Sequence, residues 1–420
     1  MPLNWKRIAL LIAFIAAVFV FGYLLYYLFL KPAIPAGPAA VNVNAGPGVL
    51  PQAGANANIP LAGNINGALP GEQKPAPLGP PAELPPAAAA ASPTANGGLT
   101  KITALTAAAA GKPALASDGV NVIYYNRATG KFYKVFPDGR TVPVSEEVFY
   151  QVQNVSWSPD KNKAVLEYPD GANIVYDFNQ NKQITLPRHW KDFSFSPDSG
   201  QLVFKSLGDS PESRWLAVVN ADGTKAVKIE PLGDKDATVY PRWSPAGQIV
   251  AMYREAKGLD SQNLYFLGLN KENFKSTIIE GQNFQGQWST KGDRLLYSVS
   301  SGAAGFKPTL WIVEAQGESI GQNRKNLGLE TWSDKCGFAD NDTVYCAVPQ
   351  TLAEGAGIFS AEMDNSPSDL YKIDLKSGFK SKIAVPEGSH NISQVIVSEN
   401  ESYLYFTSQT DGKLYKINLR

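Results

Sequence analysis

The side chains that most often carry chemistry are scarce in this chain. Its 420 residues include two cysteines, Cys336 and Cys346, and two histidines, His189 and His390. A zinc site needs three or four Cys, His or carboxylate ligands at short spacing, and neither CxxC nor HExxH occurs. We therefore expect no metal and no cofactor. A metal or acid–base role for the histidines stays open beside the plainer reading, surface or hydrogen-bonded side chains.

The two cysteines flank a short turn, CGFADNDTVYC. On adjacent antiparallel strands they would face each other, and a disulfide is permitted outside the cytoplasm. We predict that Cys336 and Cys346 are bridged, and the alternative is two buried thiols.

The stretch FSFSPDSGQLVF, from Phe193, brings Ser196, Asp198 and Gly200 together. It fits the first half of the Asp box of sialidases, S-x-D-x-G-x-T-W, but its aromatic residue is misplaced. Similar stretches elsewhere in the chain do not fit the box at all. Pro and Asp at these positions suit a tight turn whose amides are capped by side-chain oxygens. We interpret the stretch as a turn and expect no catalytic residues there.

Repetition explains the stretch better than catalysis does. The contexts SWSPD, SFSPD, RWSPA and QWSTK recur, and weaker copies read GFADN, IVSEN and LASDG. A second apolar strand, a third strand, a tight turn and a short fourth strand follow in most copies. Four-stranded propeller blades repeat about every 40–50 residues. We predict an all-β, seven-bladed propeller over residues 100–420, with six or eight blades as alternatives. The copies align on Ala116, Trp157, Phe195, Trp243, Trp288, Phe338 and Val397.

The last copy ends after its third strand, at residue 420. A strand-like piece, LTKITALT, covers residues 99–106 before the first copy. We predict that this piece completes the last blade, because closing a ring removes the open strand edge that promotes aggregation.

The WSPD and FSPDSG copies, each followed by an apolar strand, and the NADGT hairpin resemble the repeats of TolB-like β-propellers. Similar blades occur in the propellers of prolyl-oligopeptidase-type enzymes. The resemblance implies a periplasmic protein-binding module. The chain departs from TolB in having an apolar segment and a tether where TolB has an N-terminal α/β domain, which puts TolB's own partners in doubt.

The N-terminal part has a different composition. Residues 8–30 are 23 residues without a charge, enough for a helix to cross a hydrocarbon core of about 30 Å. A cleaved signal peptide and a buried helix are the alternatives. Lys6 and Arg7 precede the segment, so the positive-inside rule places residues 1–7 in the cytoplasm and the propeller on the periplasmic or extracellular side of the cell membrane.

Residues 31–99 form the predicted tether. They are rich in Pro, Ala, Gly and Asn, hold nearly half of the chain's 30 prolines and contain no aromatic residue. Such a segment cannot bury enough apolar surface to offset its conformational entropy. We expect a disordered linker that holds the propeller away from the bilayer.

A binding face is the functional hypothesis. Connections entering the innermost strands carry aromatic rings with interleaved cations, the residue types that dominate interface hot spots. The rings could instead pack between blades. The loop of residues 349–367 is a second candidate contact. The candidate face comprises Tyr150, Arg188, His189, Trp190, Lys191, Tyr240, Arg242, Phe284, Trp332 and His390.

We therefore predict a non-enzymatic binding or scaffold module of the cell envelope, with a protein or glycan partner. The net charge of zero gives no general attraction to nucleic acid. The alternative function is an enzyme acting on glycans or peptides with channel-facing carboxylates. The oligomeric state and the number of envelope membranes are left open.

Overall fold

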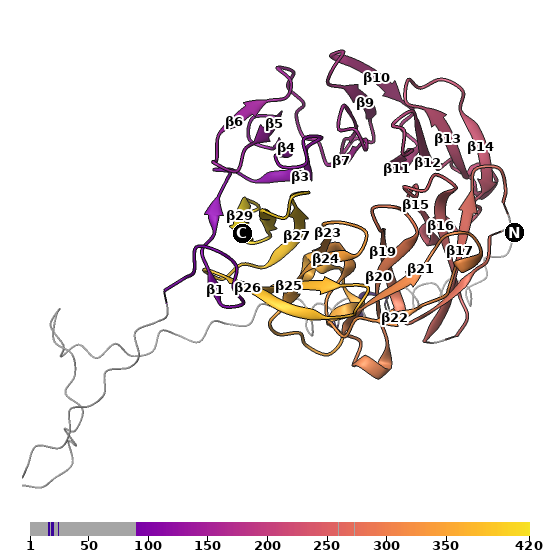
Figure 1. Ribbon diagram of the computed structural model, residues 1–420. Coiled ribbons are helices and arrows are strands. Elements are labelled where there is room, and N and C mark those ends of the chain that lie inside the picture. Colours follow the sequence, from indigo (N-terminus) through magenta and orange to yellow (C-terminus); the bar gives the residue numbers. More distant parts are fainter. Residues whose placement is uncertain (1–15, 17, 21–23, 25–89, 259, 273) are drawn as a thin grey trace, which may run out of the picture. The chain divides into compact units, whose positions relative to one another are not determined.

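The computed structural model describes residues 90–258, 260–272 and 274–420, together with residues 16, 18–20 and 24 (Figure 1). The chain divides into two compact units, Met1–Glu83 and Leu84–Arg420. In the second unit, seven sheets surround a central axis (Figure 1). The predicted seven-bladed propeller is confirmed.

Each sheet is one blade. The strands nearest the axis are β3, β7, β11, β15, β19, β23 and β27 (Figure 1). Blade 1 consists of β3 (Ala110–Leu115), β4 (Val122–Asn126), β5 (Lys131–Val135) and β6 (Thr141–Pro143). Blade 2 consists of β7 (Asn154–Trp157), β8 (Lys163–Glu167), β9 (Asn173–Asp177) and β10 (Lys182–Leu186). Blade 3 consists of β11 (Trp190–Phe195), β12 (Gln201–Ser206), β13 (Trp215–Asn220) and β14 (Val227–Pro231). Blade 4 consists of β15 (Val239–Pro241), β16 (Ile249–Ala256), β17 (Ser261–Gly268) and β18 (Thr277–Glu280). Blade 5 consists of β19 (Gln282–Trp288), β20 (Arg294–Ser300), β21 (Pro308–Glu314) and β22 (Lys325–Asn326).

Blades 6 and 7 also receive strands from the start of the described chain. Blade 6 consists of β23 (Cys336–Phe338), β24 (Thr343–Pro349), β25 (Ser368–Asp374), β26 (Lys380–Pro386) and β1 (Leu99–Thr100). Blade 7 consists of β27 (Ile392–Val397), β28 (Tyr403–Ser408), β29 (Leu414–Asn418) and β2 (Thr103–Ala104). The connections contain short 3₁₀ helices: η2 (Pro211–Ser213), η3 (Asp236–Thr238), η4 (Gly302–Ala304), η5 (Gly317–Ser319), η6 (Ser333–Lys335), η7 (Ala356–Ile358) and η8 (Ala361–Met363).

The ring closes as the sequence predicts, with one addition. Strand β2 pairs antiparallel with β29 and completes blade 7. Strand β1 pairs in parallel with β26, so it adds a fifth strand to blade 6. The segment before β1 is also attached, because the Gly97 amide donates to the Ile383 carbonyl at 2.7 Å. One short stretch therefore fastens two neighbouring blades.

The repeated Ser-Pro-Asp stretch is a turn between the first two strands of a blade. In blade 3, the Ser196 hydroxyl donates to Asp198 at 2.5 Å and accepts from the Gln201 amide at 2.8 Å. Ser158, Asp160 and Lys163 repeat the arrangement in blade 2. The serine side chain thus satisfies backbone and side-chain groups that the turn would otherwise leave buried and unpaired.

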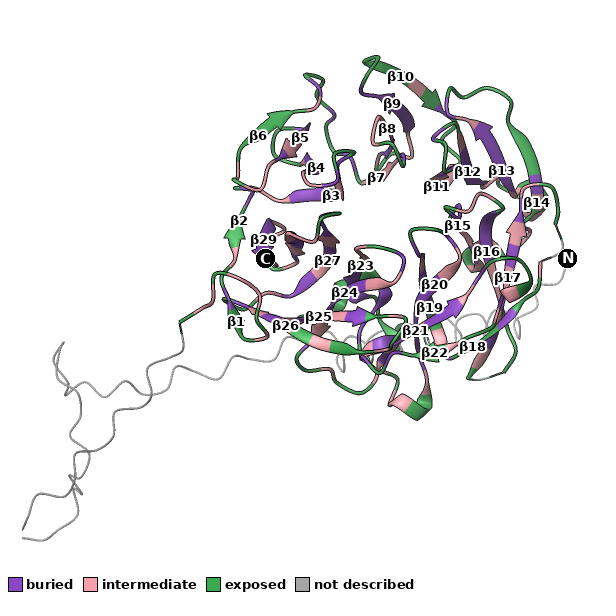
Figure 2. Ribbon diagram, viewed as in Figure 1, coloured by how far each residue is buried: buried purple, intermediate pink, exposed green. Residues whose placement is uncertain are grey.

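The hydrophobic core lies between adjacent blades. The second and third strands of each blade are mostly buried, and the fourth strands are mostly exposed (Figure 2). Between blades 1 and 2, for instance, Phe132 contacts Phe149, Trp157 and Phe178 with ring centroids 5.1–5.6 Å apart. Burial on both faces explains the nearly continuous apolar runs of these strands.

The predicted membrane segment falls largely outside the described residues. Of residues 8–30, the structure describes 16, 18–20 and 24, which are helical and exposed. None of the helices in the described part of the chain has both the length and the apolar character needed to cross a bilayer. The predicted tether lies outside the described residues up to residue 89.

Candidate functional site

The innermost strands enclose two cavities along the central axis. The larger has a volume of about 920 Å³ and lies among blades 1, 5, 6 and 7. The smaller, of about 700 Å³, lies among blades 2, 3, 4 and 5. Arg242 and Gln287 line both cavities. The two cavities are therefore adjoining parts of one channel, with an arginine and an amide where they meet.

The larger cavity has no aromatic residue in its wall, which presents polar and apolar surface in about equal parts. Four glutamines line it: Gln285, Gln287, Gln394 and Gln409. Side-chain amides both donate and accept hydrogen bonds. Three of these amides already donate within the protein: Gln394 to the Pro113 carbonyl at 3.1 Å, Gln287 to the carbonyls of Ser333 and Cys336, and Gln409 to the Glu362 carbonyl. The remaining donors and acceptors of this wall can bind a polar ligand.

The smaller cavity has aromatic residues in its wall: Phe193, Tyr240, Trp243 and Trp288. Its carboxylate, Asp192, forms an ion pair of 2.7 Å with Lys205. The pair neutralises both charges at this point of the channel wall.

Three innermost strands contain a residue at positive φ beside a shift of register. These residues are Lys112 in β3, Asp192 in β11 and Asn283 in β19, with φ of 45°, 57° and 54°. Left-handed φ is unfavourable for side chains with a Cβ, and bulges of this kind redirect a side chain. Asp192 binds Lys205, and Asn283 donates to the Gly357 carbonyl at 3.1 Å.

Five predicted binding residues reach solvent or the channel, among them Tyr240, which lines the smaller cavity. Tyr150 is 74% exposed, and His189 is exposed. Arg188 is exposed and lies 3.4 Å from Asp170. Arg242 lies in the channel, where its Nη1 donates to the Gly286 carbonyl at 2.7 Å.

Most of the other predicted aromatic rings pack within the propeller. Trp190 stacks on Phe204 with centroids 3.9 Å apart. Phe284 is buried and packs edge-on against the partly buried Tyr240. Lys191, the neighbour of Trp190 in β11, is partly buried. The structure therefore does not gather the predicted rings into one exposed surface.

His390 is half-buried beside the channel wall. Its Nδ1 lies 3.2 Å from the Ser408 hydroxyl, and its ring contacts Phe406 and Tyr415. Burial lowers the pKa of His390 below its ordinary value. The imidazole thus occupies a packed, hydrogen-bonded position.

Trp332, predicted for the binding face, is buried. It is 3% exposed, and its Nε1 donates to the Phe359 carbonyl at 3.2 Å. Phe359 belongs to residues 350–367, which connect β24 with β25 and are called the blade-6 loop below. Trp332 therefore anchors this loop.

A buried ion pair anchors the blade-6 loop at a second point. Lys335 is fully buried, and its Nζ donates to Asp364 of the loop at 2.6 Å and to Asn391 of blade 7 at 2.8 Å. Burial lowers the pKa of Lys335, and the bond to Asp364 opposes that shift. The fixed loop adds Ser360, Ala361 and Glu362 to the wall of the larger cavity. Sequence analysis missed this pair because its members are 29 residues apart.

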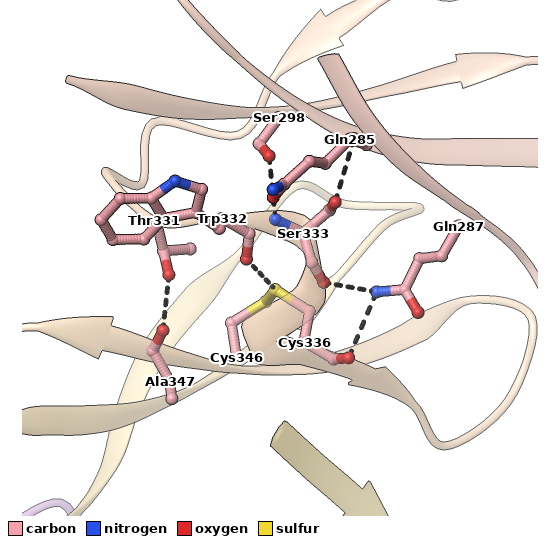
Figure 3. The surroundings of a disulfide bond; sticks show 9 residues. All are labelled: Gln285, Gln287, Ser298, Thr331, Trp332, Ser333, Cys336, Cys346 and Ala347. Carbon is pink, nitrogen blue, oxygen red and sulfur yellow. Dashed lines mark hydrogen bonds between the residues drawn. A yellow bond between two sulfur atoms is a disulfide. The ribbon is translucent and has the colours of Figure 1, made fainter. Parts of the chain in front are cut away.

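A disulfide joins Cys336 and Cys346 at the start of blade 6 (Figure 3). The two residues are direct partners on β23 and β24. Gln287 of blade 5 donates to the carbonyls of Ser333 and Cys336, at 2.7 and 3.2 Å (Figure 3). The bridged hairpin is thus tied to a channel-lining amide of the neighbouring blade.

We expect the double substitution Cys336→Ala/Cys346→Ala to lower the free energy of unfolding by roughly 2–3 kcal/mol, because the bridge restrains the unfolded chain. Urea unfolding with and without a thiol reductant measures the loss. The reductant should shift the natural chain to the variant's midpoint and leave the variant unchanged. Equal midpoints for the natural chain in both conditions would contradict the prediction.

One stretch matching a hydrolase motif lies away from the channel. Gly317 to Gly321 read GESIG, and the GxSxG pattern supplies a nucleophile only at a strand-to-helix turn. Here Ser319 ends η5 in the connection between β21 and β22, and its hydroxyl donates to the Gln316 carbonyl at 2.7 Å. The pattern lies in the connection between the third and fourth strands of blade 5, with Ile320 buried.

Carboxylates in the channel are few. Asp192 lines the smaller cavity, and Asp334 and Glu362 line the larger one. Within the described part of the chain, no group of three or more His, Cys, Asp or Glu residues is placed to hold a metal ion.

Comparison with known proteins supports the fold. No protein-family model matches the sequence, and no match to a curated protein reaches significance. An oligogalacturonate lyase in complex with manganese has a TM-score of 0.51 at 12% identity, covering 76% of this chain and 93% of that one. The β-propeller domain of Myceliophteria thermophila Cps50 (Swd1) has a TM-score of 0.50 at 11% identity, covering 76% and 100%.

The predicted relative, TolB, is also found. TolB from Acinetobacter baumannii matches with a TM-score of 0.41 at 13% identity, covering 64% of this chain and 66% of that one. This score is too low to carry an argument. At these identities, the matches to the lyase and to Cps50 show the β-propeller fold alone.

Proposed function

We propose that this chain is a membrane-tethered, extracytoplasmic binding module whose channel takes a polar segment of a protein partner. The observation that carries the proposal is the wall of the larger cavity, which has four glutamines and no aromatic ring. Amide side chains can pair with the N–H and C=O groups of an extended peptide. The apolar segment of residues 8–30 and the tether that follows support the membrane attachment.

The lining of the larger cavity favours a protein segment over a glycan, and the aromatic residues of the channel belong to the smaller cavity. Sugar rings present apolar C–H faces that pack well on aromatic side chains, and the larger cavity offers none. Glutamines on the innermost strands of blades 5 and 7, with Gln409 beside β28, instead face the cavity from several directions. This arrangement suits a chain whose polar groups point alternately to opposite sides.

Binding without catalysis is the simpler use of this channel. General acid–base chemistry needs a titratable pair within reach of one bond. Asp192 is neutralised by Lys205 at 2.7 Å. Asp334 and Glu362 are exposed on the blade-6 side of the larger cavity, and no described side chain holds either carboxylate in place. We therefore propose a ligand-binding role for the cavity, with hydrolysis or elimination on a glycan as the rival.

A photo-crosslinker at the cavity wall tests the proposal. Ser360 is exposed and lines the larger cavity, so benzoylphenylalanine there should form adducts with a protein partner in the cells that make the chain. The matched control is Val227, which is 60% exposed on the outer strand of blade 3 and should give none. Mass spectrometry of the adducts identifies the partner.

Three outcomes would contradict the proposal. Equal adducts at both positions would indicate nonspecific contact, and no adduct at Ser360 would indicate an empty channel. An adduct that contains sugar instead of peptide would favour the glycan-binding alternative.

A further inference from the structure

The larger cavity is lined by five charged side chains that lack charged partners. They are Lys112, Arg127, Arg242, Asp334 and Glu362, all exposed. In the described part of the chain, 17 ion pairs form, and none of them includes any of these five side chains. Arg242 uses Nη1 for the Gly286 carbonyl, which leaves most of its five N–H donors free.

The charges are separated by sign around the ring. Lys112 and Arg127 belong to blade 1, and Arg242 follows the first strand of blade 4. Both carboxylates come from blade 6, Asp334 from η6 and Glu362 from η8. Blades 1 and 4 each lie two blades away from blade 6, on opposite sides. The cavity therefore has one acidic wall with a basic wall on either side.

The backbone conformation at Lys112 indicates that its ammonium group is directed to a defined place in the cavity wall. Lys112 has a φ of 45° at the bulge of β3. The equivalent bulges present Asp192, which binds Lys205, and Asn283, which binds the blade-6 loop. Lys112 alone of the three has no side-chain partner in the described part of the chain, and it lines the cavity. The Lys112 carbonyl accepts from the Trp157 Nε1 at 3.1 Å, so the backbone of this bulge is fixed while its side chain is left for the cavity. Strained residues are frequent at ligand-binding positions.

We propose that the larger cavity binds a protein segment carrying an acidic group and a basic group close together. The acidic group lies against Lys112, Arg127 and Arg242, and the basic group lies against Asp334 and Glu362. Charges confined in a cavity interact more strongly than charges in open water. Opposite walls also reject segments of a single sign, because like charges would face each other. The inference rests on the proposed function and specifies its ligand.

Labelled peptides test the charge pattern with the full chain. The probe is a Gly/Ser peptide with Asp residues in one half and Lys residues in the other. Peptides of the same composition with Asp and Lys alternating, and peptides with Asp alone or Lys alone, serve for comparison. Fluorescence anisotropy should give the tightest binding for the segregated peptide, and added salt should weaken that binding.

Charge reversals separate the two walls. Arg242→Glu should weaken binding of the segregated peptide by roughly tenfold or more, since a like charge then faces its acidic half. Asp334→Lys should weaken the binding of the segregated peptide and strengthen the binding of the peptide with Asp alone. Arg140→Glu is the control, because Arg140 is 74% exposed on a hairpin turn and lies outside both cavity linings. Equal binding of the segregated and alternating peptides, or equal effects at Arg242 and Arg140, would overturn the proposal.

Lys112→Gly distinguishes a binding role from a structural one. Glycine relieves the positive φ, so the urea midpoint should stay the same or rise while peptide binding weakens several-fold. A fall in both would overturn the assignment of Lys112. If Ser360 captures a protein but no peptide binds, the charge pattern fails and the proposed function stands. If Ser360 captures nothing, both fail.

Discussion

A chain that begins at residue 108 should lose cooperative unfolding and aggregate, whereas a chain that begins at residue 90 should do neither. Residues 92–106 supply β1, which adds a fifth strand to blade 6, and β2, which completes blade 7. Without β2, the edge of β29 is open, and an unpaired strand edge templates association with other chains. Light scattering and urea unfolding of the two truncated chains measure the difference.

A single substitution isolates the packing part of this effect. Leu105 follows β2, is 5% exposed and packs between blades 7 and 1. Its amide also donates to the Leu414 carbonyl at 2.8 Å. Leu105→Ala should lower the free energy of unfolding by about 2–5 kcal/mol, the usual cost of a large cavity in a core.

The control is Leu99→Ala in the same segment. Leu99 pairs with Val385 through its backbone, but its side chain is 40% exposed. This substitution should cost less than about 1 kcal/mol, as most changes at exposed positions do. Equal losses at Leu99 and Leu105, or cooperative unfolding of the chain that begins at residue 108, would show that the ring does not depend on this closure.

The fold was predictable because its information is local and repeated. Each blade carries its own turn, exemplified by Ser196 and Asp198, and its own apolar strands. A blade whose strands are hard to recognise in the sequence can be assigned by comparison with the other blades. The closing strand was predictable for a related reason, since a seventh blade with three strands left one piece missing. The parallel pairing of β1 with blade 6 was not predictable, because two residues carry no periodicity.

The binding site was less predictable because it depends on which side chains face inward. Trp190 and Phe284 are equally suited to a surface or a core, and sequence alone does not show which neighbours cover them. The structure packs them on Phe204 and Tyr240. Conversely, the glutamines of the channel carry no distinctive motif. Only the ring geometry brings Gln287 of blade 5 and Gln394 of blade 7 to the same cavity.

Lys335→Ala should lower the free energy of unfolding by about 3–5 kcal/mol, because it leaves the Asp364 carboxylate buried without its cation. The side chains of Lys335 and Asp364 are 0% and 5% exposed, and their ion pair measures 2.6 Å. The substitution also removes a cation lying 5.5 Å from the Trp332 ring centroid. Because Asp364 belongs to the blade-6 loop, limited proteolysis should cut this loop faster in the variant.

The double substitution Lys335→Met/Asp364→Leu separates a buried charge from a lost contact. Replacing both partners with apolar side chains often restores stability, since no uncompensated charge remains. We therefore expect the double variant to recover most of the loss in urea unfolding. Lys275→Ala is the exposed control, because its ion pair with Glu318 is 55% and 91% exposed. It should change the free energy of unfolding by at most about 1 kcal/mol.

The same variants link stability to binding. The blade-6 loop contributes Ser360 and Glu362 to the cavity wall, so releasing the loop should remove part of the acidic side of the channel. Lys335→Ala should then weaken the binding of the segregated peptide even at temperatures where the propeller stays folded. The double variant should restore both peptide binding and the free energy of unfolding. A double variant as unstable as Lys335→Ala would show that the contact itself, and not the stranded Asp364 charge, holds the loop.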